Sequence, residues 1–236
     1  MIPMPPTPAM ESPPRATAPV AASAADESRD LVDEAYSTLL DMIQLGQLPI
    51  NQPLQERNLA SALGVSRTPL REAMSRLIGG GFAVRTMRGQ LIVPEPTLRQ
   101  YLEIFQMRLL LEGDAAAAAA TRMTPEQAAA ILEQVSEIKR RQHSTHEENH
   151  RVDNLLHDSI AEASGNRLMA QAIHDLRIKA RCFDQNGAPE RLIPCCDEHM
   201  DILQAILDRN PEAARAAMQR HLSNVRVGLV ARHTQL

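Results

Sequence analysis

The stretch from Leu54 to Met74 restricts the possible fold of this chain more than any other part of its sequence. Apolar residues recur there at helical spacing in two runs, which predicts two short helices that each bury one face. Gly64 separates the runs where a helix end favours a left-handed residue, and Pro69 falls in the first turn of the second helix. Ser66 or Thr68 is expected to cap that helix. The stretch therefore predicts a helix-turn-helix, and the second helix presents three polar side chains at the end suited to a DNA major groove: Arg67, Thr68 and Arg71.

The run from Gly64 to Ala73, Gly-Val-Ser-Arg-Thr-Pro-Leu-Arg-Glu-Ala, resembles the signature of GntR-type winged helix-turn-helix repressors. The resemblance implies a DNA-binding domain of three helices and a small β-hairpin wing over residues 28–94. Its first helix is expected from about Ser28 to Gly46, where apolar residues keep helical spacing. The chain has Ile50-Asn51 where the family usually has Pro-Gly, and asparagine tolerates the left-handed conformation that glycine would supply.

The predicted wing follows the second helix of this motif. Three glycines, Gly79 to Gly81, end the helix, and residues 82–85 and 90–93 have the pattern of two short strands. Arg88 lies at the tip between these strands and is expected to reach the minor groove. Gly89, beside it, lets the backbone approach a phosphate closely.

The charge of this region also fits a DNA-binding domain. Between Asn51 and Pro94 the chain has six arginines against two glutamates, whereas the whole chain has a net charge of −4. Such a local excess of positive charge is expected of a DNA-binding domain. The negative charge of the whole chain argues against a protein that binds nucleic acid along its whole surface. Arg67 and Arg71 are the expected contacts to base edges, because arginine pairs with guanine O6 and N7. The expected phosphate contacts are Arg57, Ser66, Thr68 and Gly89.

Composition favours helices and gives no sign of a membrane protein. The 236 residues include no Trp, two Tyr and three Phe, so Leu, Ala, Met and Ile must fill the core, which favours helix over sheet. No apolar run approaches the ~20 residues of a membrane span, and the N-terminus lacks the basic and apolar regions of a signal peptide. The three cysteines form no disulfide framework. A cytoplasmic protein with a disordered Pro- and Ala-rich tail over residues 1–27 is expected.

Pro94-Glu95-Pro96 predicts a stiff linker into a second domain over residues 97–230. Thr97 and Thr124 each precede a helical pattern, and Thr124 is followed by the Pro-Glu-Gln sequence of a strong helix start. The alanine run from Ala115 to Ala120 requires a neighbouring helix to pack closely. About six helices with short connections are expected in this domain, as in an antiparallel bundle. The predicted fold is therefore mainly α: a winged helix-turn-helix followed by an all-helical domain.

One carboxylate and three imidazoles form a second group of candidate functional residues. Asp153 and His157 are four residues apart and so share a helix face, while His199 and His221 belong to later helices. Histidine on an amphipathic helix is usually a surface or hydrogen-bonded core residue, so the spacing alone is weak evidence for a site. Brought together inside a bundle, the four side chains would hold a divalent transition ion such as Zn, Ni, Fe or Mn. Three other histidines lie among charged and polar residues and are expected on a solvated face: His143, His146 and His150.

Residues 153–157 and 164–166, Glu198-His199 and residues 214–222 are similar to the pattern of the FadR-type (FCD) ligand domain. The resemblance implies that the Asp and three His bind a metal, which in turn holds a small carboxylate effector. Arg108 is similar to an arginine that pairs with the effector carboxylate, and its alternative role is a surface salt bridge with Glu112. Asn166 is expected either in the same pocket or as a helix cap.

These features together predict a ligand-responsive transcriptional regulator, most often a repressor in this family. A single winged helix binds DNA weakly, so the helical domain is expected to form a homodimer on an inverted-repeat operator. The effector implied by the resemblance is a small organic acid or sugar acid. Two other functions stay open on the sequence alone: a metalloenzyme that activates water, and a constitutive DNA-binding protein with a structural metal. An enzyme is disfavoured because no general acid or base is evident near the ligands.

Overall fold

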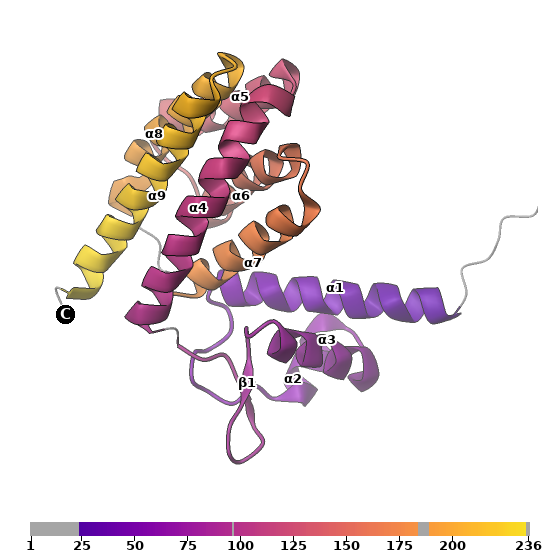
Figure 1. The fold of residues 1–236 in the computed structure, drawn as a ribbon. Coiled ribbons are helices and arrows are strands. Elements are labelled where there is room, and N and C mark those ends of the chain that lie inside the picture. Colours follow the sequence, from indigo (N-terminus) through magenta and orange to yellow (C-terminus); the bar gives the residue numbers. More distant parts are fainter. Residues whose placement is uncertain (1–23, 96, 184–188, 235–236) are drawn as a thin grey trace, which may run out of the picture.

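The computed structural model describes residues 24–95, 97–183 and 189–234 (Figure 1). The N-terminal domain has three helices and a hairpin: α1 (Ala24–Gln44), α2 (Glu56–Leu63), α3 (Arg67–Gly79), β1 (Val84–Arg85) and β2 (Leu91–Ile92). Helix α1 begins at Ala24 rather than at the expected Ser28, because two alanines and two acidic residues there favour a first helical turn. The predicted tail up to residue 23 lies outside the described residues.

The C-terminal domain is the predicted bundle of six α-helices, with one short 3-10 segment in the described residues. Its elements are α4 (Leu98–Arg122), α5 (Pro125–Arg141), α6 (His146–Ala163), α7 (Arg167–Phe183), η1 (Pro189–Arg191), α8 (Leu192–Leu207) and α9 (Pro211–Thr234). The mainly α fold is thus confirmed. Residues 184–188, between α7 and η1, and the last residue of the Pro94-Glu95-Pro96 linker lie outside the described residues. None of the described helices combines the length and apolarity that crossing a membrane requires.

The turn between α2 and α3 has the predicted backbone. Gly64 adopts φ 67°, a left-handed conformation, and its N–H donates to the carbonyl of Ala60. Ser66 occupies the N-cap of α3, but its side chain makes no capping hydrogen bond, so the predicted cap is not formed. In the connector between α1 and α2, Asn51 adopts φ 57°, which confirms that asparagine takes the left-handed conformation that glycine would supply. Its amide donates to the Glu95 carboxylate at 3.2 Å, which ties this connector to the end of the domain.

The wing is a short antiparallel hairpin. Val84 pairs with Ile92 and Arg85 with Leu91, so the strands are shorter than predicted but lie within the predicted segments. Phe82 and Ala83 precede β1 and point into the core instead of extending the strand. The wing projects away from the bundle (Figure 1), which leaves its tip open to solvent.

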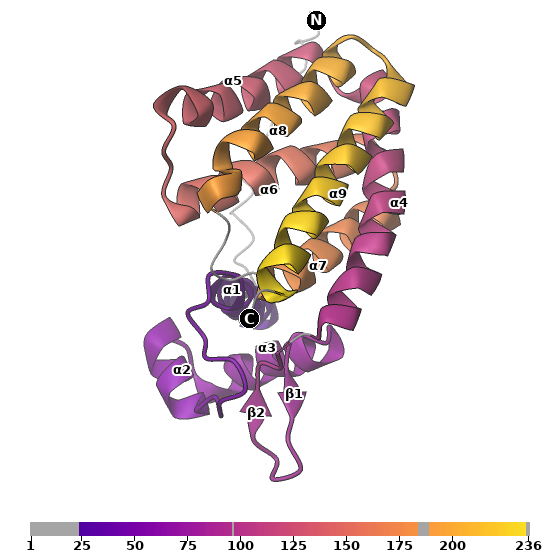
Figure 2. The ribbon, with the colours of Figure 1, turned by 90° about the vertical axis from the view of Figure 1, so that its left-hand side faces the viewer.

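Four helices of the bundle lie side by side in the order α4, α9, α8 and α5, with α6 and α7 behind them (Figure 2). The alanine run of α4 lies against neighbouring helices, and four of its members have no exposed surface: Ala115, Ala116, Ala119 and Ala120. This confirms the predicted close packing. Thr124 forms the complete capping box with the glutamine three residues on, as its sequence predicts, and Thr97, the predicted start of α4, forms the same box.

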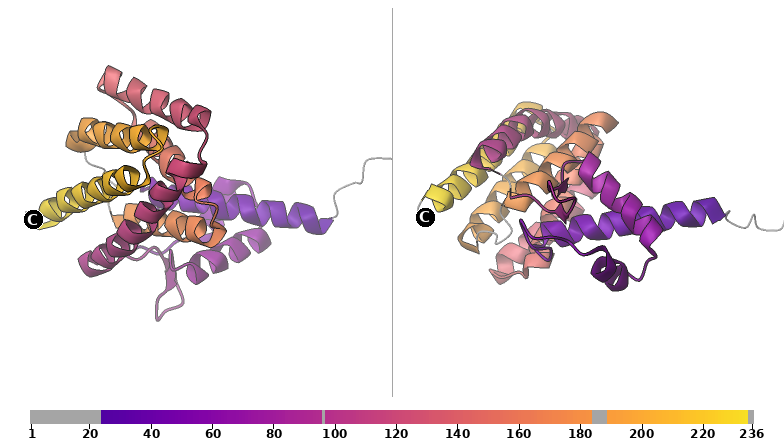
Figure 3. Two further views of the ribbon diagram at one scale, coloured as in Figure 1. Left: turned by 45° about the horizontal axis from the view of Figure 1, so that its top comes forward. Right: turned by 90° about the horizontal axis from the view of Figure 1, so that it is seen from below.

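Helix α7 belongs to the bundle but also completes the core of the N-terminal domain. Ile178 and Cys182 are buried in the same apolar cluster as Leu39, Leu70 and Phe82. Figure 1 shows α7 lying directly on α1, which separates it from α2 and α3. The part of α1 near Ala24 projects beyond the bundle in both views of Figure 3. The two domains are therefore joined by packing as well as by the linker.

Candidate metal centre and nucleic-acid interface

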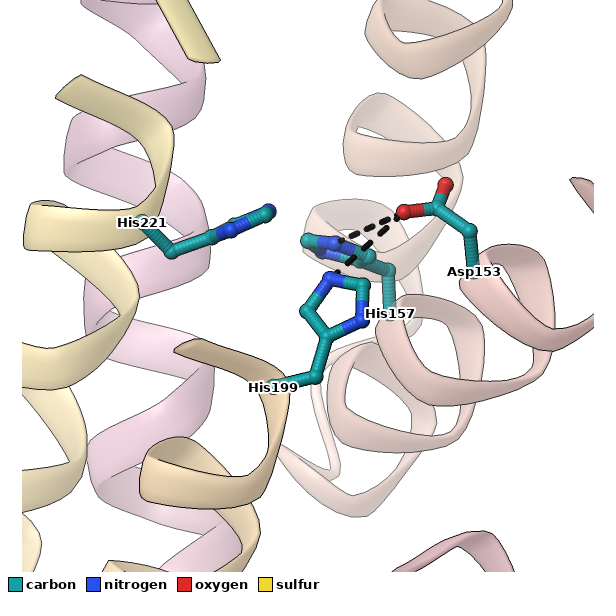
Figure 4. Close-up of side chains that lie close together, drawn as sticks. All are labelled: Asp153, His157, His199 and His221. Carbon is teal, nitrogen blue, oxygen red and sulfur yellow. Dashed lines mark ion pairs between the residues drawn. The ribbon is translucent and has the colours of Figure 1, made fainter. Parts of the chain in front are cut away.

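The four predicted metal ligands come together inside the bundle. Asp153 and His157 project from α6, His199 from α8 and His221 from α9, and all point toward one centre (Figure 4). One potential ligand atom from each side chain lies within 4.8 Å of the others. Asp153 Oδ1 is 3.6 Å from Nε2 of both His157 and His199. Residues distant in the sequence thus form one cluster of donors.

Two buried carboxylates orient two of the imidazoles. Glu112 on α4 accepts a short hydrogen bond from Nδ1 of His157, and Glu198 accepts from Nδ1 of His221 at 2.9 Å. Because an ionised carboxylate only accepts hydrogen bonds, the proton of each ring lies on Nδ1. The lone pair on Nε2 is then available at the centre, which is the arrangement usual for metal-binding histidines.

Two of the imidazoles, those of His157 and His199, are held in the neutral form that binds metals. Burial, with a further contribution from Arg177, lowers the pKa of His157 to about 4. Burial also holds the pKa of His199 well below its usual value, with His221 adding to the effect. The Nε2 atoms of His157 and His199 are buried and have no hydrogen-bond partner in the described residues. Buried nitrogens without a partner are costly, and a metal ion would satisfy both.

Asp153 supplies the negative charge of the centre. Its Oδ2 accepts hydrogen bonds from Arg177 at 2.9 Å and Arg181 at 2.6 Å, while Oδ1 faces the imidazoles. Burial alone would raise the pKa of Asp153, but the charges around it, foremost Arg177, hold the pKa well below its usual value. One ionised carboxylate and three imidazoles suit a divalent transition metal better than calcium or magnesium, which prefer oxygen ligands.

A cavity of about 180 Å³ opens beside this cluster. Its wall includes the ligands Asp153 and His221 and the aromatic rings of Tyr101 and Phe105. Five arginines also line it, which gives the cavity a strongly cationic surface: Arg108, Arg177, Arg181, Arg191 and Arg232. Such a cavity is suited to an anion, because guanidinium groups bind carboxylates in a planar, bidentate geometry.

Arg108 lies at the cavity and also pairs with Glu112, so it combines features of both of its predicted roles. It lines the cavity, and its Nε donates to Glu112 at 2.7 Å. The salt bridge is not on the surface as predicted, since Arg108 is 6% exposed and Glu112 is 1% exposed. The pair lies there because the α4 face that carries it packs against α6 and α9. Glu112 therefore links the arginine of the cavity to a ligand of the centre.

Asn166 lies apart from the cavity. It is exposed at the start of α7, where its side chain accepts the N–H of Met169 at 3.1 Å and so caps the helix. The cap is the second of its two predicted roles. His150 also differs from the prediction, because it is half-buried and lines the cavity instead of a solvated face. Its Nε2 lies 3.1 Å from Oε1 of Gln44, a contact between domains that the sequence around His150 does not indicate.

Sequence reasoning missed the groups that hold the ligands in place. Glu198 carries a signal that could have been used, because it directly precedes a predicted ligand, whereas Arg177 and Arg181 have no such neighbour. Glu198 is itself fixed by Arg191 at 2.7 Å and by the Asn224 amide at 2.8 Å. Groups that hold a ligand in place through hydrogen bonds depend on how helices pack, so their sequence positions alone do not reveal them.

The predicted DNA-contacting side chains lie on one exposed part of the N-terminal domain, on α2, α3 and the wing. Arg71 is exposed but its Nε donates to Glu56 on α2 at 2.9 Å. Arg76 faces away, since it pairs with Asp33 and stacks over the Tyr36 ring of α1. The predicted contacts that are exposed and make no ion pair within the described residues are Arg57, Ser66, Arg67, Thr68, Arg88 and Gly89.

A helix-turn-helix with an arginine-rich exposed end, joined to a helical domain that encloses a cationic cavity, defines a DNA-binding transcriptional regulator. Comparison with known families agrees: residues 31–93 match the gntR family of bacterial regulatory proteins, and residues 103–224 match the FCD domain. The chain belongs to the GntR family of regulators that carry an FCD domain. It is a regulator rather than an enzyme.

Individual relatives are similar to this chain over most of its length. The Glc operon transcriptional activator of Escherichia coli K12 is 27% identical, with 86% of this chain and 91% of that protein covered. The Exu regulon transcriptional regulator of the same strain is 25% identical, with 86% of each covered. Among solved structures, E. coli McbR/YncC has the same fold, with a TM-score of 0.77, 24% identity, and coverage of 86% of this chain and 98% of that one.

Proposed function

We propose that the protein is a transcriptional repressor of the FadR subfamily, whose operator affinity is controlled by a small organic acid or sugar acid. The effector is held in the cavity of the bundle by a divalent metal. The single observation that carries this proposal is the convergence of Asp153, His157, His199 and His221 beside a cavity lined by five arginines. The metal would act there as a Lewis acid toward a carboxylate, and the arginines would balance the remaining negative charge.

The cavity offers more than one contact to such an acid. Arg108 is held by Glu112 through Nε, which fixes the plane of its guanidinium beside the cavity. Arg177 keeps one buried nitrogen atom, Nη1, with neither a hydrogen-bond nor an ion-pair partner in the described residues, while its Nε lies 3.9 Å from Oδ1 of Asp158. An effector carboxylate would satisfy groups of this kind, which favours acids over neutral sugars. Asn166 caps α7 and has no part in the proposed pocket.

DNA recognition is assigned to the N-terminal domain of a homodimer. Two copies related by twofold symmetry would place their α3 helices on the two halves of an operator. The operator would then be an inverted repeat, because its symmetry matches that of the protein dimer. Arg67 and Arg71 would contact base edges. Arg88 would enter the minor groove at the wing. The remaining proposed contacts bind phosphates and set the register: Arg57, Ser66, Thr68 and Gly89. The relatives named for the Glc operon and the Exu regulon support a regulator of specific promoters.

A mobility-shift assay tests this function. The full chain is stripped with a chelator and titrated on DNA from upstream of its own gene, with random duplex as competitor. The titration is repeated with Zn²⁺, and again with Zn²⁺ plus single carboxylates such as citrate, succinate and gluconate. We expect specific binding that at least one acid weakens. Unchanged affinity with every acid would favour the constitutive DNA-binding protein with a structural metal, and no preference over random duplex would overturn the proposal.

A further inference from the structure

Helix α7 has two faces with different partners. Arg177 and Arg181, one helical turn apart, both donate to Oδ2 of Asp153 in the candidate metal centre. Ile178 and Cys182, each one position further along, are buried in the core of the N-terminal domain. The helix thus contacts a proposed metal ligand on one side and the DNA-binding domain on the other.

The DNA-binding domain also contributes directly to the cavity. Gln44, the last residue of α1, is 5% exposed. It is the one cavity-lining residue from that domain in the described part of the chain. Its Oε1 accepts from Nη1 of Arg181 at 2.9 Å and lies 3.1 Å from Nε2 of His150. The end of α1 is therefore held by side chains of α6 and α7.

A single guanidinium joins these two sets of contacts. Nη2 of Arg181 bonds to Asp153 at 2.6 Å, and Nη1 of the same side chain bonds to Gln44. Because the guanidinium is planar and rigid, it cannot turn toward or away from Asp153 without changing its bond to Gln44. A divalent cation on Oδ1 of Asp153 would compete with Arg181 for the carboxylate charge and would repel the guanidinium.

From this chain of contacts we propose that Gln44 is a positioning residue that couples the metal centre to the DNA-binding domain. Cation binding at the centre changes how Arg181 holds Gln44, and this changes the position of α1 against which α3 packs. The inference rests on the proposed metal-binding function. Such coupling can alter operator affinity only as far as the cation favours one position of α1 over the other.

The test compares two glutamines near the same end of α1. Gln44→Met keeps the side-chain volume but removes the hydrogen-bond acceptor, and Gln47→Met makes the same change at an exposed position three residues on. Full-length proteins are stripped with a chelator, and operator affinity is measured by fluorescence anisotropy with and without one equivalent of Zn²⁺. Zn²⁺ binding itself is measured by calorimetry, and melting temperatures check the fold.

For the wild type and Gln47→Met we expect Zn²⁺ to change operator affinity by roughly fivefold or more, the lower end of typical coupling. Gln44→Met should bind Zn²⁺ as the wild type does but show less than about half of that change on a logarithmic scale. Gln44→Glu, which keeps an acceptor for Arg181, should restore the change.

Three outcomes would overturn the inference while leaving the metal site in place. They are a full Zn²⁺ effect in Gln44→Met, Zn²⁺ binding by the wild type without any effect on the operator, and a Gln44→Glu variant that behaves like Gln44→Met. Failure of the wild type to bind Zn²⁺ would overturn the proposed metal centre and the inference together. The calorimetric arm therefore separates failure of the coupling from failure of the proposed function.

Discussion

Glu112 and His157 form a buried hydrogen-bonded pair between α4 and α6, in which the carboxylate accepts from Nδ1 of the ring. The pair fixes the direction of the Nε2 lone pair of His157. Glu112→Gln removes the charge while keeping the shape of the side chain. We expect metal affinity to fall by about 10- to 100-fold, as is typical when an outer partner of a metal-binding histidine is lost. Calorimetric titration with Zn²⁺ measures this, and Glu103→Gln, an exposed change on the same helix, should have no effect.

Removing two of the ligands should remove the metal. We expect the double variant His199→Ala with His221→Ala to purify without stoichiometric metal, because one carboxylate and one imidazole are too few to retain a divalent ion. Mass spectrometry of the metal content provides the measurement. His143→Ala is the matched control, since His143 is exposed in the connection before α6. Full metal content in the double variant would mean that the ligands lie elsewhere.

Replacing the arginines of α3 that are proposed to contact bases should affect DNA binding differently from replacing an arginine that is proposed to bind phosphate. Arg67→Ala and Arg71→Ala should each cost about 1–3 kcal/mol of specific operator binding if the arginine contacts a base. Arg57→Ala should instead weaken binding to all sequences and reduce the salt dependence by about one counterion. Competition titrations at several salt concentrations distinguish the two. Arg215→Ala, in an exposed ion pair of the bundle, is the control and should leave DNA binding unchanged.

The left-handed backbone at Asn51 should determine how substitutions there change the free energy of unfolding. Asn51→Gly keeps this conformation without strain and loses only the exposed hydrogen bonds to Glu95, so it should lower the free energy of unfolding by about 0.5 kcal/mol. Asn51→Ala should cost about 1 kcal/mol, because a Cβ without a polar partner disfavours positive φ. Denaturant titrations compare the two variants. Equal stability of both would show that the connector relaxes to another conformation.

The cysteines should react slowly in the folded protein. Burial raises the pKa of Cys182 to about 11 and that of Cys195 to about 12, and it also raises the pKa of Cys196. A raised pKa leaves little thiolate at pH 8, and the thiolate is the reactive form. Titration with a thiol reagent should therefore be slow in the native state and should count three thiols after denaturation. Rapid labelling of the native protein would contradict this.

The sequence by itself determined the features that depend on local chemistry. Gly64 sets the turn of the helix-turn-helix because only a residue without Cβ adopts its φ without strain. Thr97 and Thr124 start their helices through hydrogen bonds to residues three positions on. The spacing of Asp153 and His157 placed both on one face of α6, because residues four apart lie one above the other on a helix.

Only the tertiary structure decided which distant groups support those residues. Glu112, Arg181 and Gln44 come from three different helices. Glu112 and Arg181 reach the candidate centre because α4 and α7 pack against α6, and Gln44 reaches Arg181 because α1 packs against α7. The pattern around His150 is polar and indicated a solvated face, yet the approach of α1 buries half of it. Burial and long-range hydrogen bonds arise from the arrangement of whole helices, and a periodic pattern within one helix does not record which partner will cover it.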